Sequence, residues 1–166
     1  MAEKMSYNKS IVTLGSKCVI HPLAIVGHKG KGKIVLKSNV RVEMNVIIRT
    51  CGGIIIIGNG CRIGYFCVIH GAGGITIGDN VLLSPDVHLY AQNHGIRKDK
   101  LIAKQGQSKK GITIGDDVWI GAKSVIADGV TIGKGSVVGA GSIVTKDIPE
   151  YEIWAGNPAK KIKDRV

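Results

Sequence analysis

Aliphatic residues recur along this chain at a step of six positions. From Ile114 to Val144 every sixth residue is Ile or Val, the next residue is Gly, Ala or Thr, and the residue four places on is Ser, Val or Ile. Each hexad therefore has an aliphatic first position, a small second position and a small or β-branched fifth position. Because side chains alternate along a strand, the pattern predicts short strands joined by turns, with the first and fifth positions facing a common interior.

The hexads fall into groups of three, and the spacing between groups predicts a three-sided coil. Their first positions are Leu14, Ile20 and Val26; Ile34, Val40 and Val46; Ile57, Ile63 and Ile69; Ile77, Leu83 and Leu89; Ile114, Ile120 and Ile126; and Ile132, Val138 and Val144. The step between groups is eight, eleven, eight, twenty-five and then six residues, so the extra residues always fall at one phase of the repeat. A triangular coil tolerates this because one corner can bulge without disturbing the stack. Strands stacked about 4.8 Å apart predict a stack roughly 29 Å tall.

The predicted fold is thus an all-β parallel β-helix of about six triangular coils, which forms one domain over residues 1–150. The 25-residue step marks a long inserted loop at residues 95–113, and residues 151–166 form a basic tail. In that tail Asn157 and Pro158 are typical of a helix N-cap and first turn. We expect a short helix from Pro158 to about Arg165 that covers the open edge of the last coil.

Composition supports strands and turns and excludes several other classes. The chain has 25 Ile and 17 Val against 7 Leu, and 24 Gly, whereas aromatic residues make up only 4%. Such a composition argues against a helical bundle and disfavours a sandwich with an aromatic core. The longest aliphatic run, Ile54–Ile57, is far shorter than a membrane span. Met1–Ser10 carries two Lys and no apolar stretch, so we expect that it is not a signal peptide. We expect a cytoplasmic chain.

The four cysteines have no C-x-x-C spacing, which favours reduced thiols. Cys18, Cys61 and Cys67 take fifth positions of hexads, so we expect buried, structural thiols there. Cys51 lies near a corner bulge, and its environment is undecided. The His and Cys residues lack the grouping of metal ligands, so we expect no metal.

The net charge of +11 points to an anionic partner, and its location narrows the choice. The loop at 95–113 carries a net +5 and residues 160–166 carry a net +3. These are two local patches without a helix-turn-helix, a zinc-finger spacing or alternating basic and aromatic residues, so we expect no nucleic-acid partner. Phosphorylated cofactors and acidic saccharides are the remaining candidates.

The hexads resemble the left-handed parallel β-helix of the hexapeptide-repeat acyltransferases, over about residues 11–150. The left hand of the coil is implied by that resemblance alone. The stretch from Ile112 to Lys163, with Val-Trp-Ile-Gly at 118–121 and Gly-Asn-Pro-Ala at 156–159, is similar to the C-terminal signature of sugar and xenobiotic O-acetyltransferases. Members of the family are typically trimers with active sites between neighbouring coils, so the resemblance implies a homotrimer.

His94 lies at the root of the long loop, where the family places its catalytic histidine. Transfer of an acyl group from a thioester to a hydroxyl needs a base that works near neutral pH, and imidazole meets that need. The resemblance therefore implies that His94 is the general base. His70, Tyr90 and Asn93 are candidates for the acceptor site. Asn93 takes a fifth, inward position, and it either orients His94, binds the acceptor or is a turn-forming residue.

Small residues on the outer wall of successive coils suggest the donor site. Gly121, Ala122 and Ala140 would let a pantetheine arm lie close to the backbone, and with Thr145 and Lys146 they match positions that contact acetyl-CoA in sugar acetyltransferases. Ala122 stands where some members have Ser, so only its backbone contact carries over.

Three further residues complete the implied donor site. Lys160 and Lys163 stand where the family has Arg or Lys that reach the CoA phosphates, although Lys offers only a point charge. Trp119 matches a family Trp near the active histidine, and a trimer-contact role is an equal alternative.

Together these observations predict an acetyl-CoA-dependent O-acetyltransferase that acts on a sugar hydroxyl by direct transfer. The pattern of Asn93-His94, Gln105-Gly106 and residues 114–119 is similar to surface-polysaccharide O-acetyltransferases. Simple-saccharide enzymes instead carry acidic acceptor-binding residues where this chain has His-Gly-Ala at 70–72. N-acetylation of a nucleotide-linked amino sugar and a non-catalytic hexapeptide scaffold are the alternatives.

Overall fold

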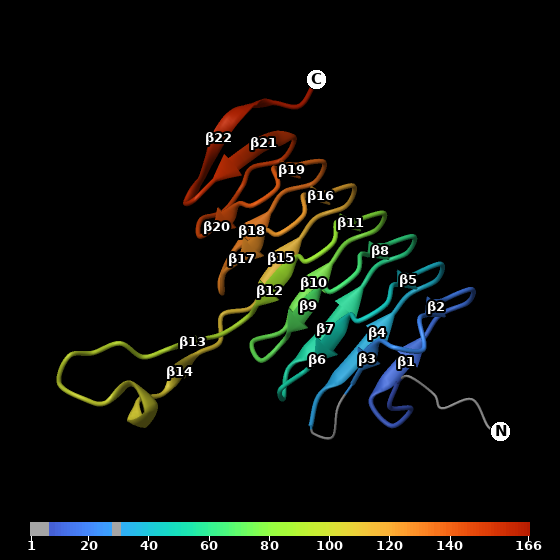
Figure 1. Cartoon of the computed structure of the whole chain (residues 1–166), viewed down its shortest axis with the longest axis horizontal. Coiled ribbons are helices and arrows are strands. Elements are labelled where there is room, and N and C mark those ends of the chain that lie inside the picture. The colour runs from blue at the N-terminus through green and yellow to red at the C-terminus, as the bar shows by residue number, and fades with distance from the viewer. Residues whose placement is uncertain (1–6, 28–30) are drawn as a thin grey trace.

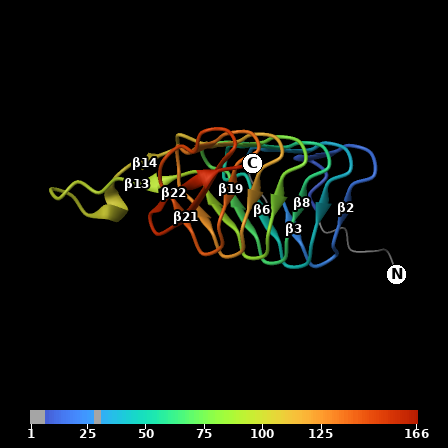
Figure 2. The ribbon, with the colours of Figure 1, turned by 90° about the horizontal axis from the view of Figure 1, so that it is seen from above.

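A computed structural model of the chain describes residues 7–27 and 31–166. Residues 1–6, which begin the segment that we judged not to be a signal peptide, and residues 28–30 lie outside the described residues. Figure 1 shows a stack of triangular coils, and Figure 2 shows the same stack from above. Each side of the triangle is a sheet to which every coil contributes one parallel strand, and the C-terminal tail adds an antiparallel strand to one of the three.

The first face of the triangle is a six-stranded sheet. Its strands, in spatial order, are β1 (Val12–Leu14), β4 (Lys33–Leu36), β7 (Ile54–Ile57), β10 (Ile75–Ile77), β15 (Ile112–Ile114) and β18 (Thr131–Ile132). Ile112 and Thr113, which the spacing had assigned to the loop, are thus the first residues of β15.

The second face has eight strands because the C-terminal tail extends it. They are β2 (Val19–Ile20), β5 (Arg41–Val42), β8 (Arg62–Ile63), β11 (Leu82–Leu83), β16 (Trp119–Ile120), β19 (Val137–Val138), β21 (Glu152–Gly156) and β22 (Ala159–Asp164). We call the turn between the first and second faces the first corner, and the turn between the second and third faces the second corner.

The third face again has six strands. They are β3 (Ile25–Val26), β6 (Ile47–Arg49), β9 (Val68–His70), β12 (His88–Tyr90), β17 (Val125–Ile126) and β20 (Ile143–Val144). The third corner, from the third face back to the first, carries every insertion, as the spacing predicted. The largest contains the short ribbon β13 (Asn93–His94) and β14 (Gln107–Ser108) and the 3-10 turn η1 (Ile102–Lys104).

The strand register confirms the coil and corrects one group of hexads. Leu36 pairs with Leu14 and with Ile57, so the second group begins at Leu36 and not at Ile34. Side chains alternate along a strand, so a slip of two residues keeps the same side chains inside. Ile34 is buried for that reason even though its assigned place in the hexad was wrong.

The interior is filled by first and fifth positions, as predicted. Ile57, Ile63, Ile69 and Ile120 are fully buried, and β-branched side chains of this kind pack well on a pleated sheet. Small hydroxyl residues take fifth positions in the later coils. Ser124 and Ser142 each donate a hydrogen bond to the Gly139 carbonyl, at 3.0 and 2.6 Å, which satisfies their buried oxygens.

The prediction of a C-terminal helix is wrong. β21 adds parallel to β19, the chain turns at Asn157 and Pro158, and β22 returns antiparallel to β21. A sheet edge presents unpaired N–H and C=O groups, and a strand satisfies them where a short isolated helix would not. The tail still covers the last coil, and its outer strand is lysine-rich, which is typical of a protected edge.

Within the described ranges, no helix has both the length and the apolar character needed to cross a membrane.

The packing of the core gives a direct stability test with a matched control. Ile63 on β8 is 0% exposed and Ile54 on β7 is 55% exposed. Ile63→Ala should lower the free energy of unfolding by about 2–5 kcal/mol, because it removes buried methyl groups and leaves a cavity. Ile54→Ala should change it by about 0.5 kcal/mol or less. Urea unfolding followed by circular dichroism measures both, and equal losses would contradict the inward assignment of Ile63.

Candidate functional site

His94 lies on a ribbon that leaves the third corner. It is exposed and pairs with Gln107 across the β13–β14 ribbon, while Asn93 pairs with Ser108. The expectation that Asn93 points inward is wrong, because the antiparallel pairing lifts it out of the coil before the hexad is complete. Figures 1 and 2 show the ribbon and its tip projecting from the body of the coil. The imidazole is therefore presented to the outside at the base of a projecting loop.

A carboxylate on the next coil anchors the return arm of this loop. Asp128 accepts a hydrogen bond from the Ser108 hydroxyl at 2.7 Å and from the N–H groups of Lys110 and Gly111 at 2.9 Å each. Partial burial raises the pKa of Asp128, but the hydrogen bonds from Ser108, Gly111 and Lys110 and the charge of Lys110 outweigh it and leave the pKa below its ordinary value. Because Ser108 pairs with Asn93, this anchor fixes the position of His94 through the ribbon.

The loop tip is ordered by its own polar contacts and exposes apolar side chains. The Gln105 side chain accepts from the Arg97 N–H at 2.8 Å and donates to the carbonyls of Arg97 and Lys100 at 2.9 Å. Three apolar side chains of this tip nevertheless face solvent. Ile96 is 83% exposed, Leu101 is 69% exposed and Ile102 is 57% exposed. Apolar exposure of this extent on an ordered loop is typical of a surface that contacts another chain.

The candidate acceptor residues gather on the outer side of the third face beside the same corner. His70 and Tyr90 are register partners on β9 and β12, with ring centroids 6.3 Å apart. The Tyr90 hydroxyl lies 3.4 Å from His88 Nδ1. The coil that carries Tyr90 continues directly into the β13–β14 ribbon, so the structure brings His70 and Tyr90 to the root of the loop that carries His94.

Two of the predicted donor residues lie at this third corner. Thr145 and Lys146 follow β20, are exposed, and continue the row that runs from Tyr90 through Ala127, since Ile126 and Val144 are register partners. They are two coils away from Tyr90 along the stack.

The other predicted donor residues lie at the second corner, where the backbone offers unused N–H groups. The turns there have a third residue with positive φ, for example 60° at Lys123 and 70° at Gly141, which is typical of type II turns. Ala122 and Ala140 each take the second position of a turn at this corner. Among the described residues, their N–H groups have no acceptor. The preceding coil has Pro85 at this position, which shows that the coil itself does not need this donor.

Gly121 is a glycine for a different reason than expected. It is buried, its N–H donates to the Val138 carbonyl at 2.7 Å, and an added Cβ would lie 2.5 Å from the Ala140 nitrogen. Close stacking of the coils therefore accounts for this glycine, and a contact with a ligand stays a prediction.

Trp119 and the tail lysines lie on the second face, next to the second corner. Trp119 is half exposed, and its indole N–H donates to the Ser84 hydroxyl at 2.9 Å. Lys163 lies in the same register row as Trp119, Val137 and Ile153. Lys160 pairs with Ala155, which is level with Gly139 above the second corner.

The predicted site residues thus form two groups on different corners of one chain. His70, Tyr90, Asn93, His94, Thr145 and Lys146 lie at the third corner, and Trp119, Gly121, Ala122, Ala140, Lys160 and Lys163 lie at the second corner or on the second face. A side of six residues separates the corners by roughly 15–20 Å. In a single chain the imidazole of His94 therefore does not face the predicted donor wall.

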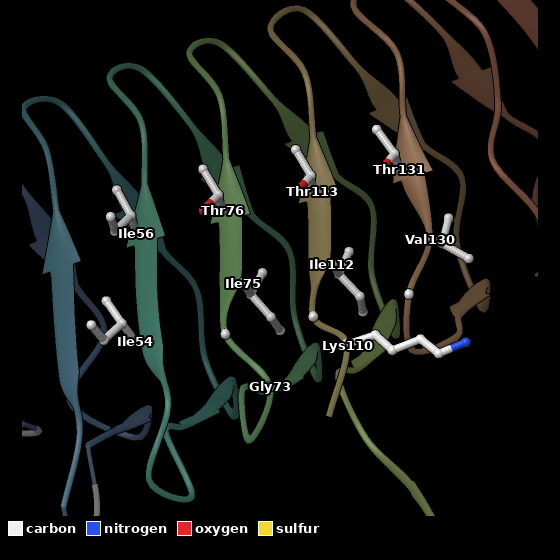
Figure 3. Close-up of a pocket in the computed structure, with 13 residues that line it drawn as sticks. Ile54, Ile56, Gly73, Ile75, Thr76, Lys110, Ile112, Thr113, Val130 and Thr131 are labelled. Carbon is white, nitrogen blue, oxygen red and sulfur yellow. The ribbon is translucent and has the colours of Figure 1, made fainter. Parts of the chain in front are cut away.

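The sequence interpretation missed a hollow of about 410 Å³ on the outer side of the first face, next to the third corner (Figure 3). It is lined by Ile54, Ile56, Gly73, Gly74, Ile75, Thr76, Lys110, Gly111, Ile112, Thr113, Gly129, Val130 and Thr131. None of the predicted site residues lines it. The repeated Ile-Thr-Ile of β10 and β15 places threonine hydroxyls in one row and is the sequence signal that could have indicated it.

The cysteines behave largely as predicted. Burial raises the pKa of Cys61 and of Cys67 to about 11, so both are inert structural thiols. Cys18 is half-buried and donates to the Lys37 carbonyl. In the part of the chain that the structure describes, no three His, Cys, Asp or Glu side chains converge as metal ligands. The absence of a metal stays a prediction.

The role of Asp128 as an anchor can be tested by the rate of tryptic cleavage, because the loop is rich in lysine and arginine. Asp128→Ala should release the return arm and speed cleavage between Arg97 and Lys110 by about tenfold or more, since hydrogen bonds to a charged group contribute roughly 1.5–3 kcal/mol each. Asp147→Ala, which removes a similar carboxylate bound to the Thr131 N–H at 2.7 Å, should leave the loop intact. Equal cleavage in both variants would contradict a specific anchor.

The same anchor gives the loop a pH dependence. The folded pKa of Asp128 lies below the unfolded value, so its stabilisation is complete above the unfolded pKa and is lost as pH falls through the folded pKa. Tryptic cleavage cannot be followed at such pH, so hydrogen exchange of the Lys110 and Gly111 amides is the measurement. Their protection should fall in acid in the wild type and should be lost at all pH values in Asp128→Ala.

Comparisons with known proteins support the hexapeptide coil. The hexapeptide models of bacterial transferases match residues 111–146, described as "six repeats", and residues 54–89, described as a repeat of succinyl-transferase. Galactoside O-acetyltransferase of Escherichia coli is 44% identical over 91 residues, which are 54% of this chain and 44% of that protein. Protein CapG of Staphylococcus aureus is 40% identical over 136 residues, which are 79% of this chain and 77% of that protein.

Two solved structures extend the similarity to nearly the whole chain. Maltose O-acetyltransferase from Clostridium difficile has a TM-score of 0.62 at 32% identity, covering 92% of this chain and 71% of its own. The N-acyltransferase AntD from Bacillus cereus, solved with dTDP and coenzyme A, has a TM-score of 0.81 at 26% identity, covering 92% and 83%. Against the first curated relatives, the matched part of this chain spans only about half of their length.

Proposed function

This chain belongs to the hexapeptide-repeat acyltransferases related to sugar O-acetyltransferases, and from that membership we propose that it transfers acetyl from acetyl-CoA to a sugar hydroxyl. The observation that carries the proposal is the placement of its polar groups. A histidine is presented at the root of an ordered loop, and a wall of unused backbone N–H groups lies one coil further along the stack.

The active site is formed between two copies of the chain. His94 leaves the coil that contains β12, and Ala122 lies on the next coil, so the two are at nearly the same height but at different corners. In a three-fold ring two different surfaces of neighbouring copies meet, and in this proposal they are the third corner of one copy and the second corner of the next. The apolar tip with Ile96, Leu101 and Ile102 then covers the neighbour instead of facing water. We therefore expect a homotrimer with three equivalent sites.

The chemistry follows from these positions. His94 accepts the proton of the acceptor hydroxyl while its oxygen attacks the thioester carbonyl. The N–H of Ala122 donates to the oxygen that becomes negative in the tetrahedral intermediate. As the intermediate collapses, the bond from carbonyl carbon to sulfur breaks and the proton on His94 passes to the CoA sulfur. No acyl-enzyme is needed, so the transfer is direct.

The donor would lie along the second corner with its phosphates at the tail. Ala122 and Ala140 offer N–H groups on successive coils for the pantetheine amides, and Lys160 and Lys163 supply positive charge further along the same direction. Trp119 is exposed beside this wall and gives the arm an apolar flank. The free thiols of all four cysteines agree with a reducing compartment, and we place the protein in the cytoplasm, where acetyl-CoA is available.

The acceptor is proposed to be a surface polysaccharide or its precursor. The loop carries a net +5 and lies where an extended, acidic glycan would pass His94. His70 and Tyr90 lie at the loop root and would contact the sugar unit that reacts.

The test is release of CoA from acetyl-CoA across a panel of sugars, oligosaccharides and nucleotide sugars, with mass spectrometry of the products. We expect release that depends on an acceptor and is greatest for acidic oligosaccharides. Acetyl-CoA binding without release would place the acceptor outside the panel. Failure of the protein to bind acetyl-CoA would overturn the donor assignment and leave a scaffold.

N-acylation is the second candidate, because AntD is an N-acyltransferase and is similar over most of this chain. The same panel distinguishes the two, since an amide product on a nucleotide-linked amino sugar withstands mild base whereas an O-acetyl ester does not.

A further inference from the structure

A thiol and an imidazole meet at the third corner, beside the proposed acceptor site. Cys51 follows β6 and His70 ends β9 on the adjacent coil, and Cys51 Sγ lies 3.0 Å from His70 Nε2. Cys51 is exposed, whereas His70 is half-buried against Tyr90. A nucleophilic atom within hydrogen-bond reach of a base is the arrangement that activates a thiol.

The other three thiols show that this contact is special in the chain. Cys18, Cys61 and Cys67 each donate to a main-chain carbonyl, at 2.8, 3.1 and 3.2 Å. A carbonyl oxygen holds a thiol proton in place but cannot remove it at neutral pH, whereas an imidazole nitrogen can. Among the four cysteines, Cys51 therefore has the one partner that can act as a base.

The second ring nitrogen of His70 supports a reactive role. His70 Nδ1 is buried and has no hydrogen-bond partner among the described residues. Unsatisfied buried polar atoms are rare, and a redox or catalytic role is one of the explanations for them. When Nδ1 carries the ring hydrogen, Nε2 is free to accept the thiol proton, and that transfer adds no further unpaired donor inside the protein.

Within one chain, the surface beside Cys51 is open to an incoming molecule. Gly52 follows it with a φ of 99°, and a Cβ placed on Gly52 would meet nothing within 4 Å. A small molecule can therefore approach Sγ from the solvent side while His70 holds the other side.

We propose that Cys51 is a modification site for low-molecular-weight disulfides, with His70 as its general base. The thiol proton passes to His70 Nε2 as Sγ attacks one sulfur of the disulfide. A new bond forms between the two sulfurs, the original disulfide bond breaks, and the leaving thiolate takes the proton from His70. The products are a mixed disulfide on Cys51 and one free thiol, and another thiol reverses the reaction. This inference does not depend on acetyl transfer.

The test uses a chromogenic aryl disulfide (Ellman's reagent) in stopped flow on the full-length native protein. We expect one rapid thiol, lost in Cys51→Ser and retained in Cys18→Ser. His70→Gln keeps a polar side chain but removes the base, and it should slow that phase by about tenfold or more. Incubation with oxidised glutathione should add one glutathione, on Cys51, as read by intact and peptide mass.

An internal control guards against a misfolded variant. Cys61 and Cys67 must stay unreactive without denaturant in every variant, because their reactivity requires opening of the core. A rapid phase that persists in Cys51→Ser, or a His70→Gln variant that reacts at the wild-type rate with its core closed, would overturn the proposal.

Discussion

Replacing His94 with alanine should lower the rate of acetyl transfer by about 10²–10⁴-fold, because the acceptor hydroxyl then loses the base that takes its proton. The loss should appear in kcat, since the donor wall lies at another corner and does not use this side chain. Binding of acetyl-CoA, measured by calorimetry, should be unchanged.

A matched histidine variant separates this effect from a general loss of histidine. His21 lies in the first coil, where its Nδ1 accepts from the Leu23 N–H at 3.1 Å, far along the stack from the loop. His21→Ala should retain wild-type kcat. If His94→Ala also keeps its activity, the base is another residue and the role assigned to His94 is wrong.

The coil was predictable because each hexad carries its own signal. The local spacing alone predicts that a residue such as Ile120 points inward, and the interior that it fills is the same in every coil. The errors occurred where local pattern is ambiguous. Ile34 and Leu36 both face inward, so burial alone does not fix the register, and only the pairing of Leu36 with Leu14 decides it.

In the C-terminal tail, by contrast, the neighbouring strand determines the secondary structure. Residues 159–164 have no strong pattern of their own, and Asn157-Pro158 suggested a helix start. β21 pairs with the open edge of β19, and β22 pairs with β21. The strand conformation of the tail therefore depends on the edge of β19, which the sequence of the tail alone does not indicate.

For the candidate site, the corner on which most residues lie was predictable from the hexads, their grouping was not, and their roles stay predictions. The hexad phase places Ala122 at the second corner and His94 at the third, so one chain separates two groups that the family resemblance joins. The Cys51–His70 contact joins adjacent coils through a corner of variable length. Such contacts follow from register and not from local sequence.

The separation of the corners leads to a prediction that mixed oligomers test. Ala122→Tyr should block the donor wall without harm to the fold, because Tyr65 occupies the same turn position in an earlier coil. Ala122→Tyr and His94→Ala homotrimers should both be inactive, the first in acetyl-CoA binding and the second in the chemical step.

Mixed trimers of these two variants should regain activity if each site uses one residue from each of two copies. In a ring of three, any mixture of the two chains has a single site that combines an intact His94 with an intact Ala122. After co-expression with different tags and purification through both, we expect about a third of the wild-type rate per trimer. Mixed trimers that stay inactive would place the whole site within one chain, which would require the loop to fold back across the third face. A protein that runs as a monomer in sedimentation would remove the shared site altogether.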